Sequence, residues 1–269
     1  MEAPLYPDHP HDPSAYWVGP RHLAGDDGRL YDTVADALAE LGWSSLTIVR
    51  GRRMPEEAEE AEEDRMVLRS TVLHISPDTL RWAQWSLPDE PLELGARPVA
   101  WQVSARSDTS SPLAEWTASF TLDIPGEVLV DFLFALDARD EPVFPVGDPE
   151  LVLEAVTARG WFRDHDQPGA RALDATLTTQ ISLGEVPPLI QDGDPRALTL
   201  QADDMGPLGW QAFSEPVMGE SLLWVVSFSA GVPHDLVASF AQALSSSAPV
   251  LRRVLPESTR DRLLRAPAS

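Results

Sequence analysis

The feature that most constrains the fold of this chain is an internal repeat. Two segments, EWTASFTLDIPGEVLVDFLFAL (115–136) and LLWVVSFSAGVPHDLVASFAQAL (222–244), each place a tryptophan-bearing run before a proline-led apolar run. Aligned at an offset of 108 positions, these segments share six residue pairs: Trp116 and Trp224, Ser119 and Ser227, Phe120 and Phe228, Pro125 and Pro233, Phe132 and Phe240, Leu136 and Leu244. Colinear matches of this kind predict a duplicated structural unit.

The repeat extends upstream of these segments in the same order. Trp101-Gln102 recurs as Trp210-Gln211, and VADALAELGW (34–43) resembles VLEAVTARGW (152–161). Both of the latter stretches have helical apolar spacing and end at a glycine, Gly42 or Gly160, as helices often do. In the helix before Gly42 we expect Asp32 to be the cap, and in the other helix Asp148 before a proline.

Between the helices of each copy lie β-branched and alternating runs separated by turn residues, which predict antiparallel strands. The predicted fold class is therefore α+β, with two tandem pseudo-equivalent units. Each unit is helix – antiparallel sheet – helix, with the helices on one sheet face. The predicted boundaries are an N-terminal tail, a first unit, a second unit and a basic C-terminal tail, at residues 1–15, 16–142, 143–248 and 249–269.

Two differences between the copies bear on function. The first copy contains the acidic run PEEAEEAEED (55–64), which we interpret as a solvated surface insertion or, alternatively, as a docking segment for a basic partner. Its closing helix also has Val130 and Phe134 on a second apolar face, where the second copy has Ala238 and Gln242. A helix that is apolar on two faces is expected to be buried twice, against the second copy or against another subunit in a homodimer.

Composition limits the classes of partner. The net charge is −23, all basic residues are arginine and cysteine is absent, so disulfides and thiolate metal sites are excluded. Strong acidity disfavours nucleic-acid binding unless arginines gather locally. No apolar run has the length of a membrane span and no secretory signal is recognised, so we expect a cytoplasmic protein without membrane contact.

Motifs for catalysis or for metals are weak. His9-Pro10-His11-Asp12 lies in a proline-rich tail without the support that a metal site needs, and the other histidines are dispersed. The chain has no Gly-x-Ser-x-Gly elbow, and it has no phosphate-binding loop because it lacks lysine. We therefore expect neither an enzyme nor a cofactor, with no catalytic, cofactor-binding or metal residues.

Aromatic and basic residues supply the candidate interaction sites. Trp17, Trp82 and Trp85 have no counterpart in the other copy, which makes them better surface candidates than the repeated tryptophans. Trp82 and Trp85 are expected on opposite faces of a strand. The segment LRRVLPESTRDRLLRA (251–266) has local positive charge and suggests two short amphipathic pieces that dock on the protein's own acidic surface, on a partner helix or on phosphate. Its candidate contact residues are Arg252, Arg253, Arg260 and Arg262.

The segment YWVGPRHLAGDDGRLYDTVADALAELGW (16–43), together with the Trp-Gln strand and the Trp-x-x-Ser-Phe helix segments, resembles the actinobacterial domain-of-unknown-function family 317, in two tandem copies. The resemblance covers most of residues 16–246. It implies no catalytic residue and a weak link to plasmids or mobile elements. Arg21 and His22 are candidate interaction residues, and if they belong to a binding surface, the second copy has lost it.

These observations together predict a non-catalytic interaction or adaptor protein with an unidentified protein partner. The alternatives are a nucleic-acid-associated protein that uses its arginine clusters, or an acidic mimic that occupies a DNA-binding partner.

Overall fold

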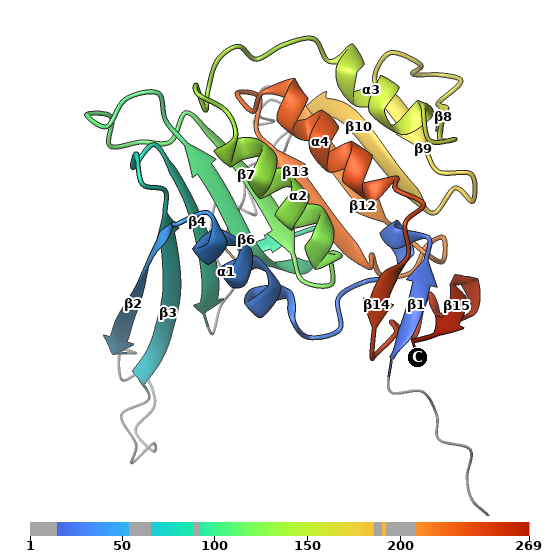
Figure 1. Ribbon diagram of the computed structural model, residues 1–269, viewed down its shortest axis with the longest axis horizontal. Coiled ribbons are helices and arrows are strands. Elements are labelled where there is room, and N and C mark those ends of the chain that lie inside the picture. Colours follow the sequence, from blue (N-terminus) through green and yellow to red (C-terminus); the bar gives the residue numbers. More distant parts are fainter. Residues whose placement is uncertain (1–14, 54–65, 89–91, 186–189, 192–207, 269) are drawn as a thin grey trace, which may run out of the picture.

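The computed structural model describes residues 15–53, 66–88, 92–185, 190–191 and 208–268 (Figure 1). Two sequence predictions lie outside these residues, namely the acidic run 55–64 and the histidine pair at positions 9 and 11. The described part is an α+β structure with four α-helices and antiparallel sheets. The predicted fold class is therefore confirmed at this level.

Most strands belong to one twelve-stranded sheet, in which every pairing is antiparallel. Its main path has the order β2-β3-β4-β6-β7-β13-β12-β10-β9-β8, while β5 pairs with β6 and β11 pairs with β5. The strands are β2 (Ser44–Arg53), β3 (Met66–Ile75), β4 (Arg81–Pro88), β5 (Leu92–Leu94), β6 (Arg97–Ala105), β7 (Trp116–Thr121), β8 (Phe162–Arg163), β9 (Arg171–Leu173), β10 (Thr179–Glu185), β11 (Ile190–Gln191), β12 (Leu208–Ser214) and β13 (Trp224–Phe228).

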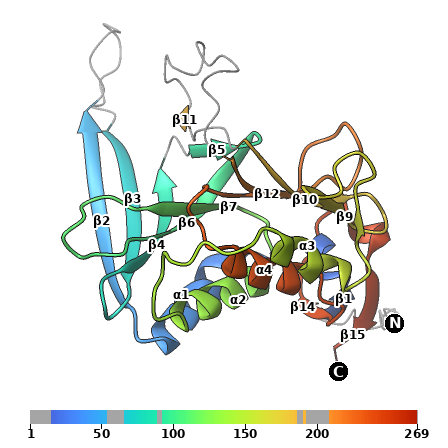
Figure 2. The same cartoon turned by 90° about the horizontal axis from the view of Figure 1, so that it is seen from above.

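Four helices lie side by side on one face of this sheet (Figure 2). They are α1 (Leu30–Glu40), α2 (Gly126–Asp137), α3 (Glu150–Thr157) and α4 (His234–Leu244). Helix α2 contacts α1 on one side and α4 on the other, and α3 contacts α4. The core fills the layer between helices and sheet, and its largest fully buried side chains include Trp101, Trp116, Trp210 and Trp224. The repeated tryptophans are thus core residues.

The predicted helix boundaries hold at the prolines and glycines. Helices α2 and α4 begin directly after Pro125 and Pro233. Gly42 and Gly160 follow α1 and α3 with φ of 76° and 89°, a conformation that glycine adopts without the steric cost of a Cβ atom.

The two predicted caps differ in outcome. Asp148 accepts a hydrogen bond of 2.9 Å from the backbone N–H of Glu150 at the start of α3, so it caps that helix. Asp32 was expected to precede the first helix, but α1 already begins at Leu30 and Asp32 lies in its first turn. The favourable position of a carboxylate there is explained by the helix dipole rather than by capping.

Strands from the two family-like halves of the chain meet in the middle of the sheet. β7 pairs with β13, and Ser119 lies directly opposite Ser227. These two serines are the residues that the 108-position alignment makes equivalent. The pairing satisfies backbone groups that two separate sheets would leave exposed at their edges.

A second, three-stranded sheet joins the two ends of the described chain. β1 (Tyr16–Gly19) lies between β14 (Val250–Arg252) and β15 (Leu264–Pro267), and both pairings are antiparallel. Val18, Leu23 and Val250 belong to the small apolar core beneath this sheet. The two amphipathic pieces predicted for residues 251–266 are therefore strands with a 3₁₀ turn (Arg260–Arg262) between them. Among the described residues, no helix combines the length and the apolar character needed to cross a bilayer.

Candidate docking surface

The outward face of the three-stranded sheet presents an apolar stripe centred on Trp17. Alternate residues of a strand face opposite sides, so Val18 points into the small core and Trp17 points away from it. Trp17 lies directly opposite Leu251 on β14 and Ala266 on β15, and it is 46% exposed. Leu264 lies opposite Gly19 on the same face and is 81% exposed. We call Trp17, Leu251, Leu264 and Ala266 the Trp17 stripe.

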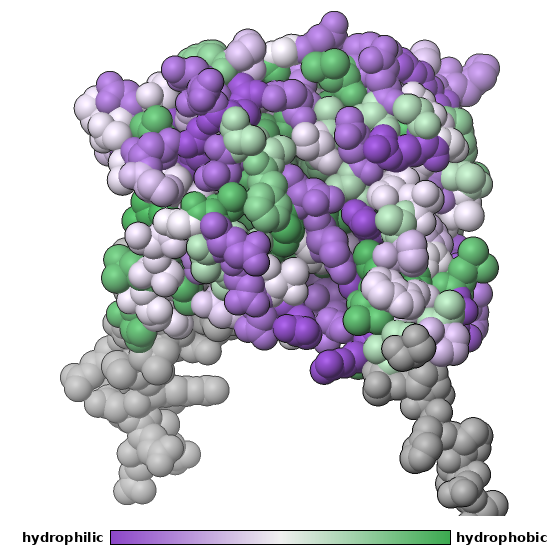
Figure 3. Space-filling view, in the orientation of Figure 1, coloured by the Kyte–Doolittle hydropathy of each residue, from purple (hydrophilic) through white to green (hydrophobic). Residues whose placement is uncertain are grey.

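Arginines lie close to this stripe along the chain, although Arg265 is directly opposite Val18 and therefore on the other face of the sheet. Four exposed arginines lie on β14, β15 and the 3₁₀ turn or directly beside them, namely Arg253, Arg260, Arg262 and Arg265. Two exposed carboxylates in the same segment, Glu257 and Asp261, leave a local charge of +2 on a chain whose total is −23. The corner of the molecule that contains this sheet mixes apolar and strongly polar residues (Figure 3, lower right). The structure therefore brings Trp17 together with the basic C-terminal segment.

A buried ion pair fixes the small sheet to the rest of the protein. Arg252 is 4% exposed, and its guanidinium donates two hydrogen bonds of 2.7 Å to the two carboxylate oxygens of Glu127 at the start of α2. Its Nε donates to the carbonyl of Gly25 at 2.9 Å. Burial alone would raise the pKa of Glu127, but the bonds from Arg252 outweigh it and the pKa is lowered. Arg252, expected from sequence to contact a partner, instead has an internal role, and its burial withdraws it from the candidate surface.

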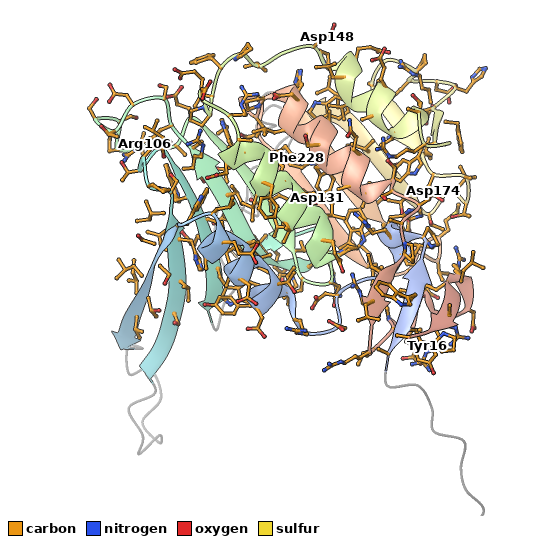
Figure 4. The ribbon with its side chains drawn as sticks, in the orientation of Figure 1. Tyr16, Arg106, Asp131, Asp148, Asp174 and Phe228 are labelled. Carbon is orange, nitrogen blue, oxygen red and sulfur yellow. The ribbon has the colours of Figure 1, made fainter. Side chains whose placement is uncertain are left out.

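Arg21 and His22 also have internal roles. Arg21 donates to the carbonyl of Ala243 at 3.2 Å and lies 3.5 Å from Asp131 on α2 (Figure 4). His22 is buried, with its Nε2 3.7 Å from Asp174, and its ring meets Trp161 edge-on at 5.5 Å. The binding surface expected at these two residues is thus occupied by contacts within the chain.

The backbone of His22 makes one further contact across the molecule. Its carbonyl accepts a hydrogen bond of 2.9 Å from Nε1 of Trp224. The segment around Arg21 and His22 therefore holds the N-terminal part of the chain against the strands and helices of the C-terminal half.

Trp82 and Trp85 face opposite sides of β4, as the sequence predicts. Trp85 is buried against Trp101, with ring centroids 5.4 Å apart. Trp82 is half-buried on the face away from the helices, where the guanidinium of Arg106 lies 5.8 Å from its ring centroid. Of these two tryptophans, Trp82 is the one that remains a surface candidate, and the guanidinium of Arg106 lies over its ring.

The second apolar face of α2 is only partly covered. Val130 is half-buried and packs on the main core, whereas Phe134 is exposed. Helix α2 lies between α1 and α4, but the burial of the second face against the other copy, expected from the sequence, does not extend to Phe134. Phe134 is left as an isolated apolar side chain on the helix layer.

Sequence reasoning missed a row of uncharged polar side chains on the helix-free face of the sheet. Gln102 lies opposite Ser119, Ser119 opposite Ser227, and Ser227 opposite Gln211. The Gln102 amide approaches the Ser119 hydroxyl at 3.4 Å. The available signal was the repeated Trp-Gln dipeptide: the core explains its tryptophan, but it does not explain why the outward residue is glutamine twice.

The described residues contain no group of three or more histidine and carboxylate side chains that would hold a metal ion. An open cavity of about 400 Å³ is lined by Arg97, Glu220, Ser221, Leu222, Leu223, Glu257 and Ser258. Its one arginine is already paired with Asp123. The arrangement offers polar contacts but no nucleophile paired with a base.

The fold and the surface together describe an α+β protein with a duplicated sequence motif and an exposed apolar stripe beside a locally basic segment. Comparison with protein families is more specific: residues 75–143 and 191–250 both match the model of SPDY, a domain of unknown function (DUF317). Two separate segments thus match the same family model, which is consistent with two tandem copies of its domain. No curated protein and no solved structure matches the chain.

Proposed function

We propose that this protein is a non-catalytic interaction protein that docks an acidic polypeptide on the Trp17 stripe and its arginine rim. One observation supports this most directly: the fold brings an exposed tryptophan together with a C-terminal segment more than 230 residues away that has four exposed arginines and a local charge of +2 on a strongly acidic chain. Interface energy concentrates in tryptophan and arginine side chains, with a polar rim around an apolar centre.

The chemistry of the partner follows from charge and shape. A partner with glutamates or aspartates is attracted to the arginines of this locally positive segment on a chain whose total charge is −23. An apolar side chain of the partner would cover Trp17 between Leu251 and Ala266, where the strand pairing keeps the stripe flat. The bidentate pair between Arg252 and Glu127 holds this surface rigid, so little ordering entropy is lost on binding.

The large sheet is proposed to be the scaffold for this surface, built of two pseudo-equivalent units of helix, sheet and helix. Support comes from the strand order, which is a mirror image about the β7–β13 seam. From the seam outward, one side runs β7, β6, β4, β3, β2 and the other runs β13, β12, β10, β9, β8. The helix order along the sheet, α1, α2, α4 and α3, has the same symmetry. The place of action is proposed to be the cytoplasm, in line with a cysteine-free composition.

A fluorescence-anisotropy titration tests the proposal. The probes are a labelled twelve-residue peptide of glutamates around one phenylalanine and, separately, a labelled single-stranded oligonucleotide. We expect the peptide to bind the wild-type protein, and Trp17→Ala to weaken it by about tenfold or more, in the range of an interface hot spot. Met218→Ala, also a change of an exposed apolar residue but outside the small sheet, is the matched control and is expected to leave binding unchanged.

The same titration separates the alternatives. Replacing Arg253, Arg260 and Arg262 by alanine is expected to reduce both peptide affinity and its salt dependence. Tight oligonucleotide binding that falls steeply with salt, together with no peptide binding, would favour the nucleic-acid alternative instead. Peptide binding that is unaffected by Trp17→Ala would refute the Trp17 stripe as the docking surface.

A further inference from the structure

One edge of the large sheet is long and unprotected. β2 pairs with β3 in continuous register from Ser44 opposite Ile75 to Arg53 opposite Met66, without a bulge. On its other side no element of the described chain pairs with it or lies beside it (Figures 1 and 2). Leu46 and Val49 are 55% and 63% exposed on opposite faces of this strand. β2 therefore offers unpaired backbone groups and exposed apolar side chains together.

The opposite edge of the same sheet is protected in the ways that natural sheets use. β8 is two residues long, and its Arg163 is ion-paired with Glu150. Short length and charge are both devices that prevent edge-to-edge pairing. Residues 44–49 of β2 have none of these devices, since the sequence Ser-Ser-Leu-Thr-Ile-Val contains no charge and no proline. An edge left in this state is a site for pairing with another strand.

We propose that β2 pairs with β2 of a second copy of this chain, in antiparallel orientation, to form a homodimer with a sheet continuous across both copies. The occupant is a second copy because the uncharged segment 44–49 lets two chains of −23 meet without confronting charges. The chain also contains the same kind of joint within itself, where β7 and β13 pair with like residues opposite each other at Ser119 and Ser227.

The side-chain pattern selects a register. Residues directly opposite each other in an antiparallel pair have their side chains on the same sheet face. When β2 pairs with another β2, an even-numbered residue must therefore lie opposite an even-numbered one, and an odd-numbered residue opposite an odd-numbered one. Placing Thr47 opposite Thr47 of the second copy puts Leu46 opposite Ile48 twice, on the helix-free face. The neighbouring register, with Ile48 on the two-fold axis, would put Leu46 opposite Arg50. The first register keeps the apolar side chains together.

Sedimentation velocity of the full-length protein over a wide concentration range tests the dimer. We expect a concentration-dependent monomer–dimer equilibrium in the wild type. Leu46→Lys with Val49→Lys is expected to raise the dissociation constant by about tenfold or more, since like charges would then lie close across the strand pair. Leu113→Lys, at an exposed loop position away from β2, is the control and is expected to change nothing. A wild type that remains monomeric throughout, or a dimer that both lysines leave intact, overturns the proposal.

The absence of cysteine allows a second test that does not depend on affinity. In the proposed register the Cα atoms of the two Thr47 residues lie about 4.5–5.5 Å apart, within the range that a disulfide spans. Thr47→Cys is therefore expected to form a covalent dimer under mild oxidation, whereas Leu113→Cys is expected to stay monomeric. Equal cross-linking of the two variants, or none at position 47, contradicts the β2 joint. These outcomes are independent of peptide binding at the Trp17 stripe, which lies on a different sheet.

Discussion

The two sides of the large sheet are alike near the β7–β13 seam and unlike at their outer ends. Near the seam, Trp116 and Trp224 occupy corresponding strands, and the indole N–H of each donates to a backbone carbonyl, at Pro142 and His22 respectively. At the outer ends, β2 has ten residues and β8 has two. The similar part is the part that closes a core, and the two sides differ at the ends, away from that core.

The turns between β3 and β4 and between β9 and β10 sharpen this comparison. In each turn the side chain of the first residue accepts a hydrogen bond from the backbone N–H five positions later. Ser76 accepts from Arg81, and Asp174 accepts from Thr179. The turns therefore have the same shape but different chemistry, a hydroxyl in one copy and a carboxylate in the other.

The largest expected effects come from the paired tryptophans. Trp116→Ala and Trp224→Ala should each lower the free energy of unfolding by about 3–5 kcal/mol, because each leaves a cavity in the core and an unpaired carbonyl. Urea denaturation followed by circular dichroism measures both, with exposed Trp17→Ala as a control expected to lie within about 0.5 kcal/mol of wild type. A large loss for one and a negligible loss for the other would break the equivalence of the two halves.

The turn residues should differ in magnitude. Asp174 accepts bonds of 2.7 Å from the N–H of Thr178 and 2.6 Å from that of Thr179, so Asp174→Ala should cost about 2–3 kcal/mol. Ser76→Ala removes a hydroxyl that accepts one backbone N–H, that of Arg81, and donates to Asp78, which is itself partly exposed, and should cost about 1 kcal/mol. Equal losses on urea denaturation would mean that the carboxylate adds nothing to the shared turn.

The carboxylate also makes the second turn sensitive to pH. Burial would raise the pKa of Asp174, but the nearby His22 ring and hydrogen bonds from Thr176 and Thr179 outweigh burial, and the pKa lies well below its ordinary value. A depressed folded-state pKa stabilises the protein above the unfolded value of about 3.9 and loses that effect as pH falls further. The stability difference between wild type and Asp174→Asn should therefore shrink below about pH 4, as measured by urea denaturation over a pH series.

The smallest expected effects on stability are at the left-handed residue of each of these two turns. Thr79 and Leu177 have φ of 61° and 60°, a region that strains a residue with a Cβ atom. Thr79→Gly and Leu177→Gly should each raise stability by a few tenths to about 1 kcal/mol, since relief of strain exceeds the added entropy of the unfolded chain. Ser110→Gly, in a turn without positive φ, should not stabilise. Thermal melts that show opposite signs for the two glycine variants would separate the turns.

The local parts of the fold were predictable because their signals are local. Proline before α2 and α4, glycine after α1 and α3, and repeated tryptophans in the core all follow from short-range geometry and burial. The position of Asp32 was misjudged because a carboxylate in the first helical turn and a carboxylate at the cap look alike in sequence.

The non-local parts were not predictable for an equally physical reason. Nothing in residues 16–19 indicates that they pair with residues 250–252 and 264–267, because three or four strand residues have no distinctive period. The same limit hid the fate of Arg252: its sequence neighbour Arg253 is exposed, and only the position of Glu127 on α2 decides that Arg252 is buried.

The seam between Ser119 and Ser227 has a consequence for how such a chain evolves. In an assembly of two identical subunits, a substitution on the symmetry axis occurs in both subunits, and the two new side chains contact each other. Here one gene encodes both sides of the joint, so a bulky replacement at position 119 can be accommodated by a smaller one at position 227. Covalent fusion thus frees each half to drift separately, which a symmetric pair of identical chains cannot do.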